Sequence, residues 1–192
     1  MQNITWDVRY STPPLVLKYC KKCRKKMKHV SSGRFRVNAQ GKYLDIWLIY
    51  KCTACQTTWN LPLYSRITPE SIPCGLLDRF YGNDETLALQ YAFSTSLLQE
   101  NGAEIVLPDY QVSGPLPAPG TPVRLQIKSR YSLPVKVTSV LCQKLKLSRR
   151  ELEKIMNNGR IQNISPKELK KCRLNQGVTI YLEETVPAPD SP

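Results

Sequence analysis

Two cysteine pairs constrain this chain more than any other feature of its sequence. Cys20 and Cys23 form the first C-x2-C pair, and Cys52 and Cys55 form the second. A two-residue gap lets both sulfur atoms of a pair face one ion from a single tight turn, and two such turns complete a tetrahedral site of four thiolates. The sequence therefore predicts one structural zinc ion, with these four cysteines as its ligands.

The segment between the two pairs is expected to be a β-hairpin. Residues 34–50 end in an alternating apolar series on one strand face, namely Leu44, Ile46, Leu48 and Tyr50. A two-stranded excursion absorbs the 28 residues that separate the pairs, and a further strand is expected over residues 57–61. These features predict an N-terminal zinc ribbon, with Trp47 and Trp59 in its core.

Catalytic chemistry finds little support in the sequence. His29 is the only histidine, and as a ligand it would have to displace a cysteine from a complete set of four. Residues 56–122 contain no nucleophile–base pair, phosphate-binding glycine loop or dinucleotide fingerprint. We therefore expect a protein that is not an enzyme.

The formal net charge of +13 is unevenly distributed. Residues 1–68 hold 13 Lys and Arg against two Asp and Glu, residues 69–121 hold one against seven, and residues 122–192 hold 14 against six. Two basic ends around an acidic middle favour a polyanionic partner. Solubility and charge compensation between segments are the alternative explanation.

A cluster of cations surrounds the first cysteine pair: Lys21, Lys22, Arg24, Lys25, Lys26 and Lys28. Such a cluster can bind phosphates. It can equally offset the formal charge of −2 on a zinc tetrathiolate, which is a structural role. The sequence leaves both interpretations open.

The chain is expected to have an α+β fold in several parts. The zinc ribbon covers residues 1–68, and an acidic helical bridging segment with a Pro/Gly-rich loop covers residues 69–121. A C-terminal module covers residues 122–184, and a flexible tail follows over residues 185–192. No apolar run approaches the length of a membrane helix, and the first residues do not resemble a signal peptide, so we expect a cytoplasmic protein without membrane contact.

The clearest helix signal in the C-terminal part lies at residues 149–158. Ser148 and Glu151 form a capping box, and Gly159 ends the helix. The inward positions are apolar and the outer positions are Arg149, Arg150 and Lys154.

This region resembles the alpha-L RNA-binding domain found in a ribosomal small-subunit protein, in some tyrosyl-tRNA synthetases and in pseudouridine synthases. The resemblance covers residues 136–183 and is carried by Leu147-Ser148-Arg149, Ile155, Gly159-Arg160-Ile161, Leu174, Gly177 and Ile180. After Ile161 the usual hairpin is replaced by residues 162–171, which can start a helical turn at Ser165. The resemblance implies binding of structured RNA, ribosomal or tRNA-related, through Lys144, Lys146, Arg149, Arg150, Lys154 and Arg160.

The whole chain is also similar to a family of bacterial proteins of unknown function. The similarity is carried by residues 35–50, by the second cysteine pair and by Thr58-Trp59-Asn60. It implies a zinc ribbon in the bacterial cytoplasm and no particular activity. We therefore expect a non-catalytic zinc protein that binds RNA. The alternative is a zinc-ribbon adaptor, for protein interaction or associated with transcription, without RNA binding.

Overall fold

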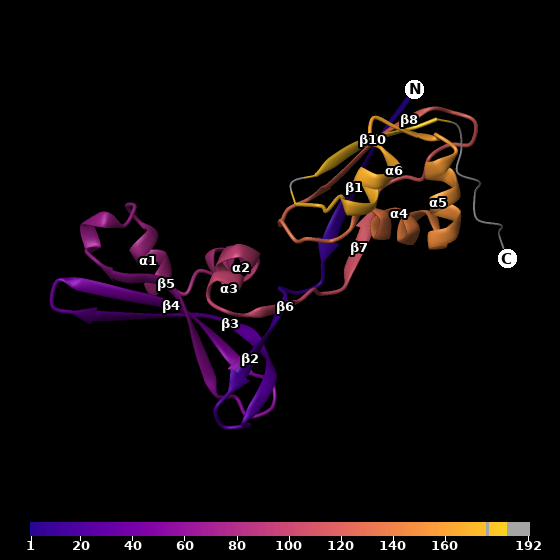
Figure 1. The fold of residues 1–192 in the computed structure, drawn as a ribbon. Coiled ribbons are helices and arrows are strands. Elements are labelled where there is room, and N and C mark those ends of the chain that lie inside the picture. Colours follow the sequence, from indigo (N-terminus) through magenta and orange to yellow (C-terminus); the bar gives the residue numbers. More distant parts are fainter. Residues whose placement is uncertain (176, 184–192) are drawn as a thin grey trace. The chain divides into compact units, whose positions relative to one another are not determined.

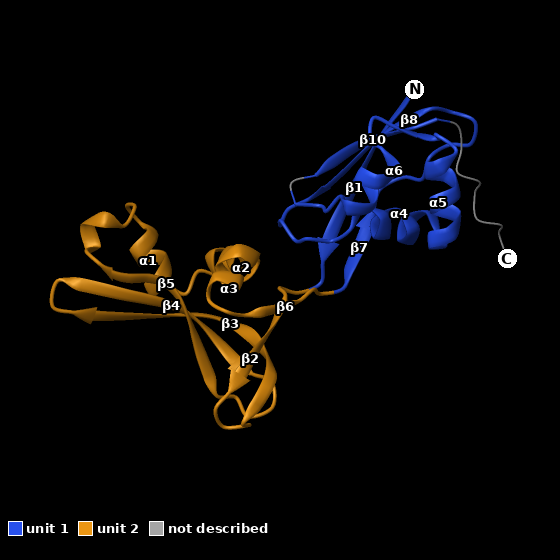
Figure 2. Ribbon diagram, viewed as in Figure 1, with its two compact units in different colours: residues 1–11, 109–192 blue, residues 12–108 orange. Residues whose placement is uncertain are grey.

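The computed structural model describes residues 1–175 and 177–183, and it divides into two compact units (Figure 2). Unit 1 contains residues 1–11 and 109–192, and unit 2 contains residues 12–108. The predicted boundaries at residues 68 and 121 differ from this division, because the N-terminal strand joins the C-terminal unit and the acidic helical segment joins the cysteine-containing unit. The tail expected over residues 185–192 lies outside the described residues.

Unit 2 is built on an antiparallel sheet with the strand order β5-β4-β3-β2-β6 (Figure 1). Its strands are β2 (Leu15–Cys20), β3 (Lys25–Gln40), β4 (Tyr43–Cys52), β5 (Thr58–Ile67) and β6 (Glu104–Val106). The long β3–β4 hairpin confirms the predicted hairpin, and it turns at Gly41, whose φ of +58° suits a residue without a Cβ. The predicted face of β4 is buried, with Leu44, Ile46, Leu48 and Tyr50 at 5% exposure or less.

Three helices and a 3₁₀ turn complete unit 2. They are η1 (Pro69–Ser71), α1 (Leu76–Tyr81), α2 (Glu85–Ala92) and α3 (Thr95–Glu100). The aromatic ring of Phe80 on α1 meets that of Phe35 on β3 edge to face at 4.9 Å. The helices and the sheet share one apolar core, and this sharing explains why the acidic segment is not a separate layer.

The two tryptophans of the predicted ribbon core have different surroundings. Trp59 packs against the core, 5.3 Å from the ring of Tyr50, and the Lys18 ammonium lies 4.8 Å from its ring centre. Trp47 is half-buried and has the Arg36 guanidinium 5.8 Å from its ring. The core assignment is therefore confirmed for Trp59.

Unit 1 contains a mixed sheet with the strand order β7-β1-β8-β10-β9. Its strands are β1 (Gln2–Tyr10), β7 (Tyr110–Ser113), β8 (Val123–Ser129), β9 (Ile161–Gln162) and β10 (Val178–Leu182). Strands β1 and β8 are parallel, and the other pairs are antiparallel. Trp6 on β1 is fully buried, and its indole N–H donates to the Pro115 carbonyl at 2.8 Å.

Three helices pack together beside this sheet (Figure 1): α4 (Val137–Leu145), α5 (Arg149–Asn157) and α6 (Pro166–Lys171). Helix α5 begins with the predicted Ser148–Glu151 capping box, and α6 begins with an equivalent box formed by Ser165 and Glu168. Because the sheet takes β1 and β7 from outside residues 122–184, unit 1 is larger than the predicted module. Among the described residues, no helix has both the length and the apolar character needed to cross a membrane.

Candidate metal centre

The two cysteine turns lie together because strand β3 pairs with both of their parent strands. Strand β2 ends at Cys20, which pairs with Lys25 at the start of β3. Strand β4 ends at Cys52, which pairs with His29 four residues further along β3. The first cysteine of each pair is thus the last residue of a strand, and the second lies in the turn that follows.

Both turns use the same backbone device. The residue after the second cysteine is left-handed in each, with φ of +55° at Arg24 and +59° at Gln56. In the second turn the Gln56 amide donates to the Cys52 carbonyl at 3.0 Å, and the Cys52 amide donates to the Thr57 carbonyl at 2.9 Å. This conformation returns the chain into the next strand and leaves both sulfur atoms on one side. No glycine marks either position, so the sequence gives no signal of it.

The four sulfur atoms form one compact group. The Sγ atoms of Cys20 and Cys55 are 3.4 Å apart, those of Cys23 and Cys52 are 3.9 Å apart, and all four lie within 4.8 Å of one another. A tetrahedron with Zn–S bonds of about 2.3 Å has S–S edges of about 3.8 Å. The predicted cysteines therefore come together in a group that can hold a metal ion.

Burial and hydrogen bonding differ within the group. Cys20 and Cys52 are buried, whereas Cys23 and Cys55 are partly exposed. Hydrogen bonding by the side chain and backbone of Thr57 lowers the pKa of Cys55 to about 6. Hydrogen bonding with Cys55, assisted by burial, raises the pKa of Cys23 to about 12. Ionisation of one thiol thus opposes ionisation of its neighbour, as expected where negative charges share a small site.

His29 pairs with Cys52 across the β3–β4 ladder, but its ring makes a different contact. Its side chain is buried, and Nδ1 lies 3.0 Å from the Met27 carbonyl oxygen. Among the described residues, the group of possible metal ligands contains the four cysteines without His29. The interpretation of His29 as a residue outside the metal site agrees with this geometry.

Exposed cations surround the cysteine turns. Lys26 forms an ion pair with Glu104 on β6. The other cations predicted around the first pair, which are Lys21, Lys22, Arg24, Lys25 and Lys28, are all exposed. Their positions fit both interpretations of this cluster, because each cation faces solvent close to a site with negative charge.

The six residues predicted to bind RNA all belong to unit 1. Arg150 and Lys154 are exposed on α5, Lys146 is exposed at the end of α4, and Lys144 is half-buried. Arg160 follows α5 and is exposed. The positions of these residues do not test whether they contact RNA, so RNA binding stays a prediction.

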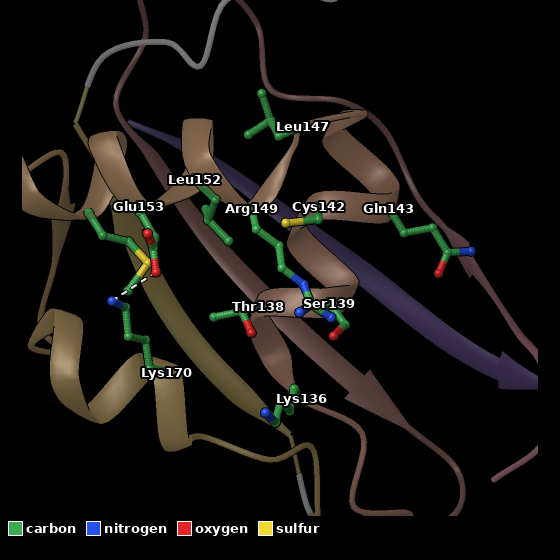
Figure 3. A pocket seen from close by; sticks show the side chains of 11 residues that line it. Lys136, Thr138, Ser139, Cys142, Gln143, Leu147, Arg149, Leu152, Glu153 and Lys170 are labelled. Atoms are coloured by element: carbon green, nitrogen blue, oxygen red, sulfur yellow. Dashed lines mark ion pairs between the residues drawn. The ribbon is translucent and has the colours of Figure 1, made fainter.

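Arg149, like its neighbour Arg150, is exposed at the start of α5. Its side chain lines a pocket between the helices of unit 1 (Figure 3). The pocket is also lined by Lys136 and Lys170, which the sequence analysis did not single out. These residues come from the N-cap of α4, from α5 and from α6 and share no sequence motif, so only the tertiary structure brings them together.

Comparisons with known proteins identify the family of the chain and leave its activity open. No curated protein and no solved structure matches the chain. The resemblance to the alpha-L domain therefore finds no support among them. A family model described as a protein of unknown function (DUF1062) matches residues 37–167, more than half of the chain. The chain therefore belongs to the DUF1062 family, as the similarity of residues 35–50 implied.

Proposed function

We propose that the protein is a non-catalytic, zinc-stabilised binding protein whose cysteine group holds one structural zinc ion. The observation that carries the proposal is the approach of four Sγ atoms to within 4.8 Å on two equivalent turns. Four thiolates fill a tetrahedral coordination shell and leave no open position for water or substrate, as in structural zinc sites. The ion would tie β2, β3 and β4 together at one end of the sheet.

The proposal is tested by metal analysis of protein purified under reducing conditions without added metal. We expect one zinc ion per chain, lost in Cys55→Ser together with stability of unit 2, because binding energy at a structural zinc site is folding energy. Cys74→Ser is the matched control, since Cys74 is an exposed cysteine of unit 2 outside the sulfur group. Wild-type protein that carries no metal and oxidises to a disulfide would contradict the proposal.

For the binding partner we propose structured RNA, contacted by the outer face of α5. The observation that favours it is the exposure of Arg150 and Lys154, which lie four residues apart and so share one helix face. Lys146 and Arg160, at either end of this region, are also exposed and add to the positive charge. Counterion release from about four phosphate contacts gives a log–log salt slope of about −3 to −4.

Charge reversal separates RNA binding from the adaptor function. Arg150→Glu combined with Lys154→Glu is expected to weaken binding of a tRNA more than about tenfold and to make the salt slope shallower by about two. The matched control is the same reversal at Lys21 and Lys25 beside the cysteines, which are exposed like the α5 pair. Loss of binding in the control alone would assign the RNA face to unit 2. Absence of binding by wild-type protein at low salt would favour the protein adaptor.

A further inference from the structure

A pocket of about 540 Å³ opens between α4, α5 and α6 of unit 1 (Figure 3). Its size falls within the range of pockets that take small organic ligands. All the residues that line the pocket belong to unit 1, whereas the cysteine group belongs to unit 2. Neither the proposed zinc site nor the outer face of α5 accounts for it.

The lining of the pocket is positively charged. Lys136, Arg149 and Lys170 contribute three cations and Glu153 contributes one carboxylate, so the formal charge is +2. Lys170 and Glu153 pair with each other at 2.9 Å and join α6 to α5. This ion pair leaves Lys136 and Arg149 as the cations available to an anionic ligand.

Arg149 is directed into the pocket. Its guanidinium extends from the start of α5 toward Thr138 and Ser139 (Figure 3). In the part of the chain that the structure describes, no carboxylate forms an ion pair with it. A guanidinium presents several N–H donors in a planar fork that matches phosphate and carboxylate oxygens.

The first turn of α4 forms the wall that Arg149 faces. Thr138 and Ser139 line the pocket from this turn, and Lys136 is the N-cap residue of the helix. Two hydroxyl groups supply further donors, and the positive end of a nine-residue helix favours an anion beside it. The guanidinium, the hydroxyls and the helix end therefore converge on one side of the pocket.

Most of the other lining residues are apolar, and the polar exception is Gln143, whose side-chain amide donates to the Tyr110 carbonyl at 3.2 Å. Leu152 and Met156 on α5 are almost fully buried, and Leu147 and Cys142 line the same pocket. Apolar side chains cannot form hydrogen bonds with an inorganic ion, but they can pack against the organic part of a ligand. The pocket thus combines an anion-binding side with an apolar side.

We propose that this pocket binds a small organic phosphate monoester. The phosphate would accept hydrogen bonds from Arg149 and from the hydroxyls of Thr138 and Ser139, and the organic group would cover Leu147 and Cys142, which are only partly buried. A monoester carries nearly two negative charges at neutral pH, which balances the +2 lining better than a single carboxylate does. This function is additional to RNA binding, because Arg150 and Lys154 take no part in the pocket lining.

The test is calorimetric titration of the full-length, metal-loaded protein with phenyl phosphate. Arg149→Ala is expected to weaken binding at least about tenfold, because a charge-assisted hydrogen bond to the phosphate is lost. Arg150→Ala is the matched control, since it removes an adjacent arginine outside the pocket lining, and it is expected to change the affinity by less than about twofold. Inorganic phosphate and phenol are each expected to bind more weakly than phenyl phosphate, because each lacks one half of the ligand.

A second readout uses the wild-type protein alone. Cys142 lines the pocket, whereas Cys74 is an exposed thiol in unit 2. Phenyl phosphate is expected to slow alkylation of Cys142 by iodoacetamide in a saturable manner and to leave the rate at Cys74 unchanged, as followed by peptide mass spectrometry. No binding heat with unprotected Cys142, equal affinity in Arg149→Ala, or equal binding of inorganic phosphate would each overturn the proposal.

Discussion

The packing beneath the cysteine turns can be tested by removing one oxygen atom, the hydroxyl of Tyr50. This residue lies on β4 two positions before Cys52, and its side chain is completely buried in the core of unit 2. Its hydroxyl oxygen is buried, and no described residue forms a hydrogen bond with it. The ring itself is well packed, 5.3 Å from the ring of Trp59.

The change Tyr50→Phe is therefore expected to stabilise unit 2. A buried hydroxyl without a partner costs about 1–3 kcal/mol of desolvation, and phenylalanine keeps the ring while removing that group. We expect the free energy of unfolding at neutral pH to rise by about 1 kcal/mol, near the lower end of this range because the space left by the oxygen is not refilled.

The pH dependence of the same variant gives a second, independent magnitude. Burial raises the pKa of Tyr50 above its ordinary value of 10.0. Above that pH the unfolded chain loses the phenolic proton while the folded chain retains it, so the wild-type protein loses stability as pH rises toward the folded pKa. Tyr50→Phe has no phenolic proton to lose at this position. The difference in free energy of unfolding between the variant and the wild type should therefore grow by about 1.4 kcal/mol per pH unit above pH 10.

Urea unfolding of the metal-loaded proteins, followed by tryptophan fluorescence at pH 7 and above pH 10, measures both effects. Tyr81→Phe is the control, because Tyr81 is 58% exposed and its change should alter stability by less than about 0.5 kcal/mol. If Tyr50→Phe instead lowers stability at pH 7 by about 1 kcal/mol, the hydroxyl has a hydrogen-bond partner and the reasoning is wrong.

Two further substitutions test unit 1. Gly114 has φ of +125°, and a Cβ there would lie 2.4 Å from the Thr5 carbonyl oxygen, so Gly114→Ala is expected to cost roughly 3 kcal/mol or more in a thermal or urea unfolding assay. Gly120→Ala is its control, because Gly120 has space around its Cα and should cost only about 1 kcal/mol; equal costs would refute the clash. Ser148→Ala removes the side-chain acceptor of the Glu151 amide at the start of α5. It is expected to destabilise unit 1 by about 1 kcal/mol. An unchanged unfolding midpoint would show that the capping box does not stabilise the helix.

The features that the sequence predicted correctly are those encoded by neighbouring residues or by the ligand requirement of a metal ion. The alternation of Leu44 to Tyr50 gives the buried face of β4, and the spacing of Ser148 and Glu151 gives the start of α5. The two C-x2-C pairs identify the four sulfur atoms that come together. The strand and helix signals lie within a few residues, where backbone geometry fixes which side chains meet. The two cysteine pairs are 28 residues apart, and their meeting was predicted from the four ligands that a tetrahedral zinc site needs.

The features that the sequence did not reveal depend on pairing across long stretches of chain. Residues 2–10 pair in parallel with residues 123–129, and nothing in either segment specifies the other. The insertion of unit 2 after residue 11 follows from this pairing. The pocket that Arg149 lines could not be predicted either, because helical periodicity predicts only the exposed position that Arg149 has, and a pocket between three helices is a property of their packing.

The central claim is that four thiolates of unit 2 hold one zinc ion, and X-ray absorption spectroscopy at the zinc edge tests it most directly. The measurement uses the full-length protein as purified under reducing conditions. The sulfur group predicts a single shell of four sulfur atoms at about 2.3 Å from the metal. A first shell that contains nitrogen or oxygen in place of any of the four sulfur atoms, or a protein that takes up no zinc, would contradict the claim.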